Sequence, residues 1–201
     1  MSAPAPRPAL QQRVAAAILD GAARLFATEG EQASMNDVAV AAGVARATVY
    51  RYFPNRQALL DELAHAAVSD ADARLVSARI DEVAPVDGIA RAVRALVDVG
   101  DPFVLLARER VRSDPGRFDR SVIQPLRRLF ERGQAAGDVR GDIASTRLTE
   151  SLIGSIVGVL LSTPTLGKED AIATITGLFL DGARARGPRL ASRSIPSLEE
   201  E

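Results

Sequence analysis

The chain has 201 residues, of which 47% are apolar and 25% are charged, and its formal net charge is −1. This length holds one or two small domains with a buried core, and the apolar content excludes disorder throughout. There is no cysteine and one histidine, His65, which excludes disulfides, cysteine nucleophiles, thiolate metal sites and two-histidine zinc motifs. Because a glycine-rich phosphate-binding loop is also lacking, we expect no metal, no other cofactor and no enzyme.

Membrane attachment and export are not expected. The longest apolar run, Ile153–Leu161, has nine residues, whereas a membrane-spanning helix needs about 20. Residues 1–9 alternate proline and alanine and lack the apolar segment of a signal peptide. We therefore expect a cytoplasmic protein with no membrane partner and a disordered arm over residues 1–9.

Apolar residues recur at helical spacing along the whole chain, and glycine, proline and aspartate separate the segments, which predicts an all-α fold. The first helix is expected over residues 10–28, with Leu10 and Ile18 on its buried face. Pro125 is expected to kink a helix or to mark its true start. The later helices are expected over residues 56–80, 86–99, 102–112, 118–136, 143–162 and 168–186, followed by a disordered tail over residues 187–201.

Two short helices joined by a tight turn are predicted over residues 34–53. Ser34 and an acid three residues later are spaced as in a capping box, which begins the first of these helices. Its expected inward residues are Val38 and Ala41, and Gly43 supplies the turn. Such a pair of helices is typical of the helix-turn-helix motif, whose second helix enters the major groove of DNA.

The second short helix carries a local basic patch. Residues 44–57 contain three arginines and no acid, although the whole chain is slightly negative. Arginine can contact guanine through two hydrogen bonds, and tyrosine or threonine hydroxyls suit phosphate oxygens. Phe53 is assigned to the core, and at least one of the two tyrosines is expected to face outward. The residues of this helix expected at DNA are Arg46, Ala47, Thr48, Tyr50, Arg51 and Tyr52.

Several stretches form a pattern more specific than a generic helix-turn-helix: ILDGAARLF (18–26), SMNDVA (34–39), AGV (42–44) and TVYRYFPNRQALL (48–60). Through them the chain resembles the tetracycline-repressor-like (TetR) family of bacterial transcription regulators. The resemblance implies a three-helix DNA-binding domain at residues 10–55 and a helical effector-binding and dimerisation domain at residues 56–186. It also implies phosphate contacts by Ser34 and Arg56. Ala45 stands where the family usually has serine or threonine, which removes a helix N-cap worth about 1 kcal/mol.

The C-terminal segment suggests two further sites. Small residues at helical spacing on the penultimate helix either pack inside the protomer or let a second subunit approach, and we expect the second. The expected dimer interface is Ser151, Gly154, Ser155, Gly158 and Ser162, with Ile172, Ile175 and Phe179 from the last helix. The few aromatic residues here form core or line an effector pocket, since such pockets are mostly apolar. The expected pocket residues are Phe103, Leu106, Arg110, Phe118, Phe130, Leu152 and Ile156.

Together these features predict a homodimeric transcriptional repressor. It would bind double-stranded operator DNA of near-palindromic sequence and be released by an apolar small-molecule effector. His65 is expected in solvent or between domains, with an effector contact as the alternative. The alternative hypothesis is a helix-turn-helix DNA-binding protein with a filled C-terminal core and no small-molecule pocket. Its DNA binding would be controlled by a partner protein or would be constitutive. A cavity in the helical domain would favour the first hypothesis.

Overall fold

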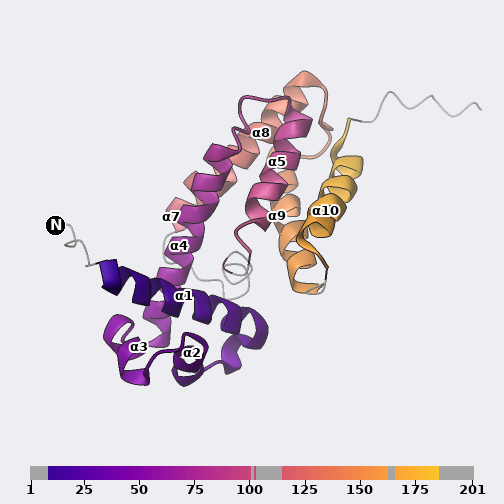
Figure 1. Ribbon diagram of the computed structural model, residues 1–201. Helices are drawn as coiled ribbons and strands as arrows, with labels where there is room; N and C mark the ends of the chain where they lie inside the picture. Colours follow the sequence, from indigo (N-terminus) through magenta and orange to yellow (C-terminus); the bar gives the residue numbers. More distant parts are fainter. Residues whose placement is uncertain (1–8, 101, 103–114, 163–165, 186–201) are drawn as a thin grey trace, which may run out of the picture.

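The computed structural model describes residues 9–100, 102, 115–162 and 166–185, and within these ranges the chain is helical and contains no β-strand. Figure 1 shows α1, α2 and α3 grouped at one end of the molecule, with α4 rising from this group into a bundle formed by the later helices. The all-α prediction is confirmed. The predicted helix 102–112, the arm and the tail lie outside the described residues, apart from Ala9 and Pro102, which are helical.

The N-terminal group, called the reading head below, consists of α1 (Ala9–Glu29), a 3-10 turn (Gly30–Gln32), α2 (Met35–Ala41) and α3 (Arg46–Tyr52). Gly30 and Gly43 have φ of +60° and +65°, a left-handed conformation that glycine adopts without strain, and they end α1 and form the turn after α2. These three helices and the first turns of α4 enclose a core centred on Ile18, Phe26 and Val38.

Two residues predicted to face this core do not. Leu10 is 72% exposed, because the buried face of α1 begins only at Ala15, where α1 meets the rest of the head. Ala41 is also exposed, because the inward face of α2 is centred on Met35, Val38 and Ala39. With a rotation of 100° per residue, Ala41 lies about 115° from the middle of that face and is turned toward solvent.

The remaining elements are α4 (Arg56–Ser77), α5 (Pro85–Val97), α7 (Pro115–Phe118), a π-helical turn (Asp119–Ile123), α8 (Gln124–Ala136), α9 (Ser145–Ser162) and α10 (Lys168–Ala183). They share a second core. At the π-helical turn Gln124 donates its backbone N–H to the carbonyl of Asp119, five residues back. Pro125 follows directly and has no backbone N–H to donate to the carbonyl four residues earlier. The helix α8 begins at Gln124, so Pro125 marks a helix start, which was one of the two outcomes predicted for it.

The long helix α4 takes part in both cores. Leu59 and Leu63 pack in the reading head, whereas Ala67 and Leu75 pack in the bundle. The predicted domain boundary at residue 56 coincides with the start of α4, but the change from one core to the other falls between Leu63 and Ala67. A shift of α4 would therefore be felt in both parts. None of the described helices has the length and apolarity needed to cross a membrane.

Candidate nucleic-acid interface

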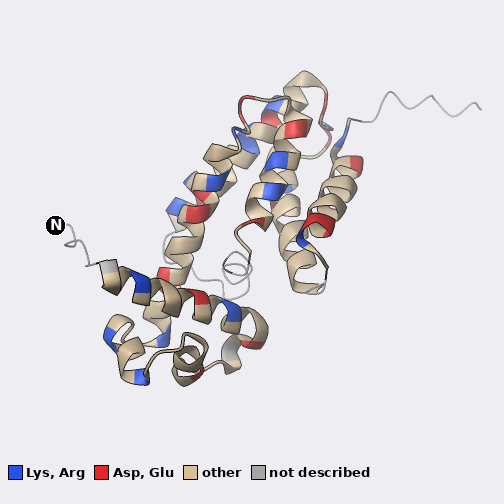
Figure 2. Cartoon of the chain, in the orientation of Figure 1, with Lys and Arg blue, Asp and Glu red and all other residues tan. Residues whose placement is uncertain are grey.

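The helix α3 presents one face to the core and the other to solvent. Val49 is fully buried, and Phe53, which follows the helix, is buried in the head core as predicted. Tyr50 is exposed and Tyr52 is half-buried, so one tyrosine faces outward as expected. Figure 2 shows basic residues on α3 at the outer edge of the head. Of the residues expected at DNA, Arg46, Ala47, Tyr50 and Arg51 are exposed, and Thr48 and Tyr52 are half-buried.

Both arginines of α3 lie against an aromatic ring. The guanidinium carbon of Arg46 is 5.4 Å from the ring centroid of Tyr50, and that of Arg51 is 5.4 Å from the ring centroid of Tyr52. Such cation–π contacts are worth about 0.5–1 kcal/mol at exposed sites, and they limit the conformations open to a long side chain. The rings thus support two outward guanidinium groups whose N–H donors can meet base edges or phosphates.

The start of α2 is fixed by the predicted capping box. The Ser34 hydroxyl donates to Asp37 Oδ2 at 2.6 Å, and the Ser34 backbone N–H donates to the same oxygen at 3.0 Å. In return, the Asp37 backbone N–H donates to Ser34 Oγ at 3.3 Å. The bonds from Ser34 hold the pKa of the Asp37 carboxyl below its ordinary value. Ser34 is exposed, so its expected phosphate contact stays a prediction.

The lowered pKa of Asp37 predicts a pH-dependent contribution to stability. A carboxyl whose pKa is lower in the folded state stabilises the fold above its unfolded pKa, and this contribution is lost as pH falls through the folded value. The stability gap between wild type and Asp37→Asn should therefore shrink as pH is lowered from 6 to about 3, measured by thermal unfolding. In a Ser34→Ala background the difference in stability caused by Asp37→Asn should change less with pH, because the hydroxyl that lowers the pKa of Asp37 is absent. A gap that is constant over this range would contradict the assignment.

The start of α3 lacks a side-chain cap. Ala45 occupies the N-cap position in an extended conformation, and no side-chain hydrogen bond closes the helix there. An Ala45→Ser substitution should supply that bond and raise the free energy of unfolding by about 1 kcal/mol, measured by denaturant titration. Ala16→Ser, on the exposed side of α1, is the matched control and should destabilise slightly. If both substitutions have the same effect, Ala45 is not a helix-start position that a hydroxyl can cap.

The side chain of Arg56 turns toward the reading head, and its expected phosphate contact stays a prediction. Its side chain is half-buried, donates a hydrogen bond to the backbone oxygen of Gly30 and lies over the ring of Phe26. The two residues that contact the Arg56 side chain, Gly30 and Phe26, are 26 or more positions earlier in the chain. No local sequence motif predicts this contact.

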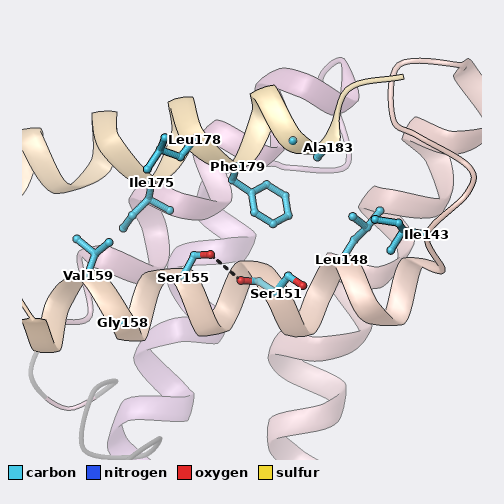
Figure 3. Close-up of a pocket in the computed structure, with 11 residues that line it drawn as sticks. Ile143, Leu148, Ser151, Ser155, Gly158, Val159, Ile175, Leu178, Phe179 and Ala183 are labelled. Atoms are coloured by element: carbon cyan, nitrogen blue, oxygen red, sulfur yellow. Dashed lines mark hydrogen bonds between the residues drawn. The ribbon is translucent and has the colours of Figure 1, made fainter. Parts of the chain in front are cut away.

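The outer faces of α9 and α10 form a groove. Figure 3 shows Ser151, Ser155 and Gly158 along α9, opposite Phe179 and Leu178 on α10. The groove has a volume of about 480 Å³, and inside it Ser155 Oγ donates to the carbonyl of Ser151 at 2.8 Å. The five small residues of the predicted interface, Ser151, Gly154, Ser155, Gly158 and Ser162, are all exposed. Side chains added at Gly154 or Gly158 would meet nothing within 4 Å, so packing inside the protomer is the wrong explanation for them.

Two residues of α10 expected at the interface are turned inward. Ile172 and Ile175 are buried in the bundle core, so their side chains are not available to a second subunit. Leu178, three residues after Ile175 on α10, is 73% exposed and takes their place on the outer face. Phe179 is half-buried, with its ring centroid 5.7 Å from that of Phe130.

Some of the expected effector-pocket residues lie in the core of the bundle, and the others lie outside the described residues. Phe130, Leu152 and Ile156 are fully buried in the bundle core, and Phe118 packs against it. Phe103, Leu106 and Arg110 lie outside the described residues. An effector pocket at these positions stays a prediction.

His65 lies on the exposed side of α4 and contacts α7. Arg117 Nη1 is 2.8 Å from Nδ1 and 2.9 Å from Nε2 of its ring, and Arg117 Nη2 donates to Ser69 Oγ at 2.8 Å. His65 therefore joins two elements of the helical bundle through a polar contact, in agreement with the prediction of a solvent-facing position.

An exposed arginine-bearing helix that follows a short helix and a tight turn is the arrangement of a helix-turn-helix motif, whose second helix enters the major groove of DNA. Residues 18–63 match the family described as "Bacterial regulatory proteins, tetR family". The match covers α1 from Ile18 onward, α2, α3 and the start of α4, so this part of the chain is similar to the DNA-binding part of TetR-family transcriptional regulators.

Two curated relatives match parts of the chain. The HTH-type transcriptional repressor LfrR of Mycolicibacterium smegmatis is 38% identical over 106 residues, which cover 52% of this chain and 54% of LfrR. The uncharacterized HTH-type transcriptional regulator Rv1255c of Mycobacterium tuberculosis is 54% identical over 50 residues, 24% of each chain. This chain therefore aligns with about half of the length of LfrR and about a quarter of that of Rv1255c.

Solved structures resemble the chain over most of its length. LfrR from Mycobacterium smegmatis in complex with proflavine has a TM-score of 0.71 and 22% identity, covering 86% of this chain and 97% of that one. AibR in complex with isovaleryl coenzyme A and operator DNA has a TM-score of 0.67 and 21% identity, covering 82% and 97%. These similarities show that the fold is shared.

Proposed function

We propose that the protein is a homodimeric transcriptional repressor that binds a near-palindromic operator through α3 and is released by a small-molecule effector. The observation that carries the proposal is the pair of outward guanidinium groups of Arg46 and Arg51 on a helix whose inner side is buried. The names of the relatives support it, since LfrR is a repressor and AibR has been crystallised with operator DNA.

Dimerisation is proposed to occur through the outer faces of α9 and α10. Small residues let helix backbones approach closely, and Leu178 offers an exposed apolar side chain beside the groove. Two reading heads can bind one operator only if their α3 helices are about 34–36 Å apart, one turn of DNA, so the interface would set this spacing.

The effector is proposed to act through α4. Because α4 belongs to both cores, a ligand in the helical domain that tilts α4 would move the reading head and spoil the spacing of the α3 helices. The ligand can shift this equilibrium only by its difference in affinity for the two forms. A coupling of about 1–3 kcal/mol is typical, and operator DNA must then weaken effector binding by the same factor.

The test begins with selection of bound sequences from random DNA by the full chain. Candidate compounds are then titrated calorimetrically into the protein with and without the selected operator. Proflavine is a reasonable first compound, because the LfrR structure holds it. Weaker binding in the presence of operator supports an effector-controlled repressor. Equal affinities across a broad set of compounds would favour control by a partner protein or constitutive binding, and failure to select any sequence would refute the proposal.

A further inference from the structure

Arg56, the first residue of α4, points into the reading head. Its Nη2 donates a hydrogen bond to the backbone carbonyl of Gly30 at 3.2 Å. Its guanidinium carbon lies 4.7 Å from the ring centroid of Phe26, and its Nε is shielded from solvent. Arg56 therefore contacts both the last turns of α1 and the turn that follows α1.

These contacts hold the guanidinium in one orientation. Phe26 is fully buried, and Gly30 has the left-handed backbone that ends α1, so both partners are fixed by the fold. Rotating the side chain outward would lose the ring contact and the hydrogen bond together. A planar guanidinium can stack on a ring and donate from its edge at the same time, which an ammonium group cannot do.

We propose that Arg56 is a positioning residue that fixes the reading head to the start of α4, and that it does not bind DNA phosphate. This inference rests on the proposed function, because its purpose is to place α3 on the operator. From Arg56, α4 continues into the bundle core at Ala67 and Leu75. The contact with Phe26 adds to the packing of Leu59 and Leu63 in the head and fixes the orientation of the head on the first turn of α4.

Salt dependence of operator binding separates this role from a phosphate contact. A lost phosphate contact lowers the slope of log affinity against log salt by about 0.9, or about 1.8 for the two subunits of a dimer. For Arg56→Gln we expect an unchanged slope and a loss of about tenfold in affinity that is the same at every salt concentration. Arg56→Lys keeps the charge but loses the planar group, so it should also lose affinity.

Two controls calibrate the measurement. Arg24→Gln removes an exposed arginine of α1 and gives the effect of lowering the charge of the head alone. Arg46→Gln removes an outward guanidinium of α3 and should lower the slope, which shows that the assay detects a lost DNA contact. Circular dichroism at each salt concentration establishes that the variants are folded.

A double-mutant cycle with Phe26→Leu gives a second, independent readout. Phe26 is buried and cannot touch DNA, so its substitution alters binding only through the head. If Arg56 acts through this ring, Arg56→Gln should cost less than about twofold in the Phe26→Leu background. A full tenfold loss there, a lowered slope for Arg56→Gln, or full activity of Arg56→Lys would overturn the proposal. Failure of the wild-type chain to select any DNA would instead overturn the proposed function, and this inference with it.

Discussion

Gly158→Leu is expected to convert the protein from a dimer into a monomer while leaving the protomer folded. Gly158 is exposed on α9, and a side chain added there meets nothing within 4 Å of its Cβ, so the protomer accommodates leucine. Leucine is also a better helix former than glycine. In a dimer formed by α9 and α10, however, the added bulk would hold the two helix backbones apart.

The consequence for operator binding is large. A dimer binds its second half-site intramolecularly, and this advantage is commonly about 10²–10⁴-fold, so the monomeric variant should lose affinity by such a factor. Sedimentation or light scattering measures the oligomeric state, and thermal unfolding checks the fold. Ala135→Leu, on the exposed side of α8, is the matched control and should stay dimeric. A Gly158→Leu protein that remains a dimer with wild-type operator affinity would mean that subunits meet at another surface.

The local features of the reading head could be read from the sequence because they depend on neighbours within a few residues. The capping box at Ser34, the turn at Gly43 and the missing cap at Ala45 are each defined by one to four consecutive positions. The inward position of Arg56 could not be predicted in the same way. It depends on Gly30 and Phe26, which reach Arg56 only once α1 has packed against α4.

The last helix shows a different limit of sequence analysis. Helical periodicity places Ile172, Ile175 and Leu178 near one another, but α10 is apolar on more than one side. The pattern alone does not say which side meets the protomer core. Packing against α5 and α9 buries the two isoleucines and leaves the leucine outside. The small residues of α9 are exposed, so they do not pack inside the protomer, and their contact with a second subunit stays a prediction.

Arg51→Ala is expected to weaken operator binding selectively. Arg51 is exposed on α3, and its guanidinium is supported by the Tyr52 ring, so its donors are free to meet base edges in the major groove. A two-hydrogen-bond contact to guanine discriminates against other bases by about 1–3 kcal/mol, and the effect applies to each half-site of the dimer. Affinity for the selected operator should therefore fall by about 5- to 150-fold per half-site, with a smaller change on unrelated DNA.

Repeating the sequence selection with the variant tests this role directly. The base preference should relax at one position in each half-site and stay intact elsewhere. Arg128→Ala, which removes an exposed arginine from α8, is the control for net charge and should leave both affinity and preference unchanged. If Arg51→Ala weakens selected and unrelated DNA equally, Arg51 contacts phosphate and Arg46 becomes the stronger candidate for base recognition. If neither affinity nor base preference changes, Arg51 does not face the operator, and the orientation of α3 on DNA differs from the one proposed.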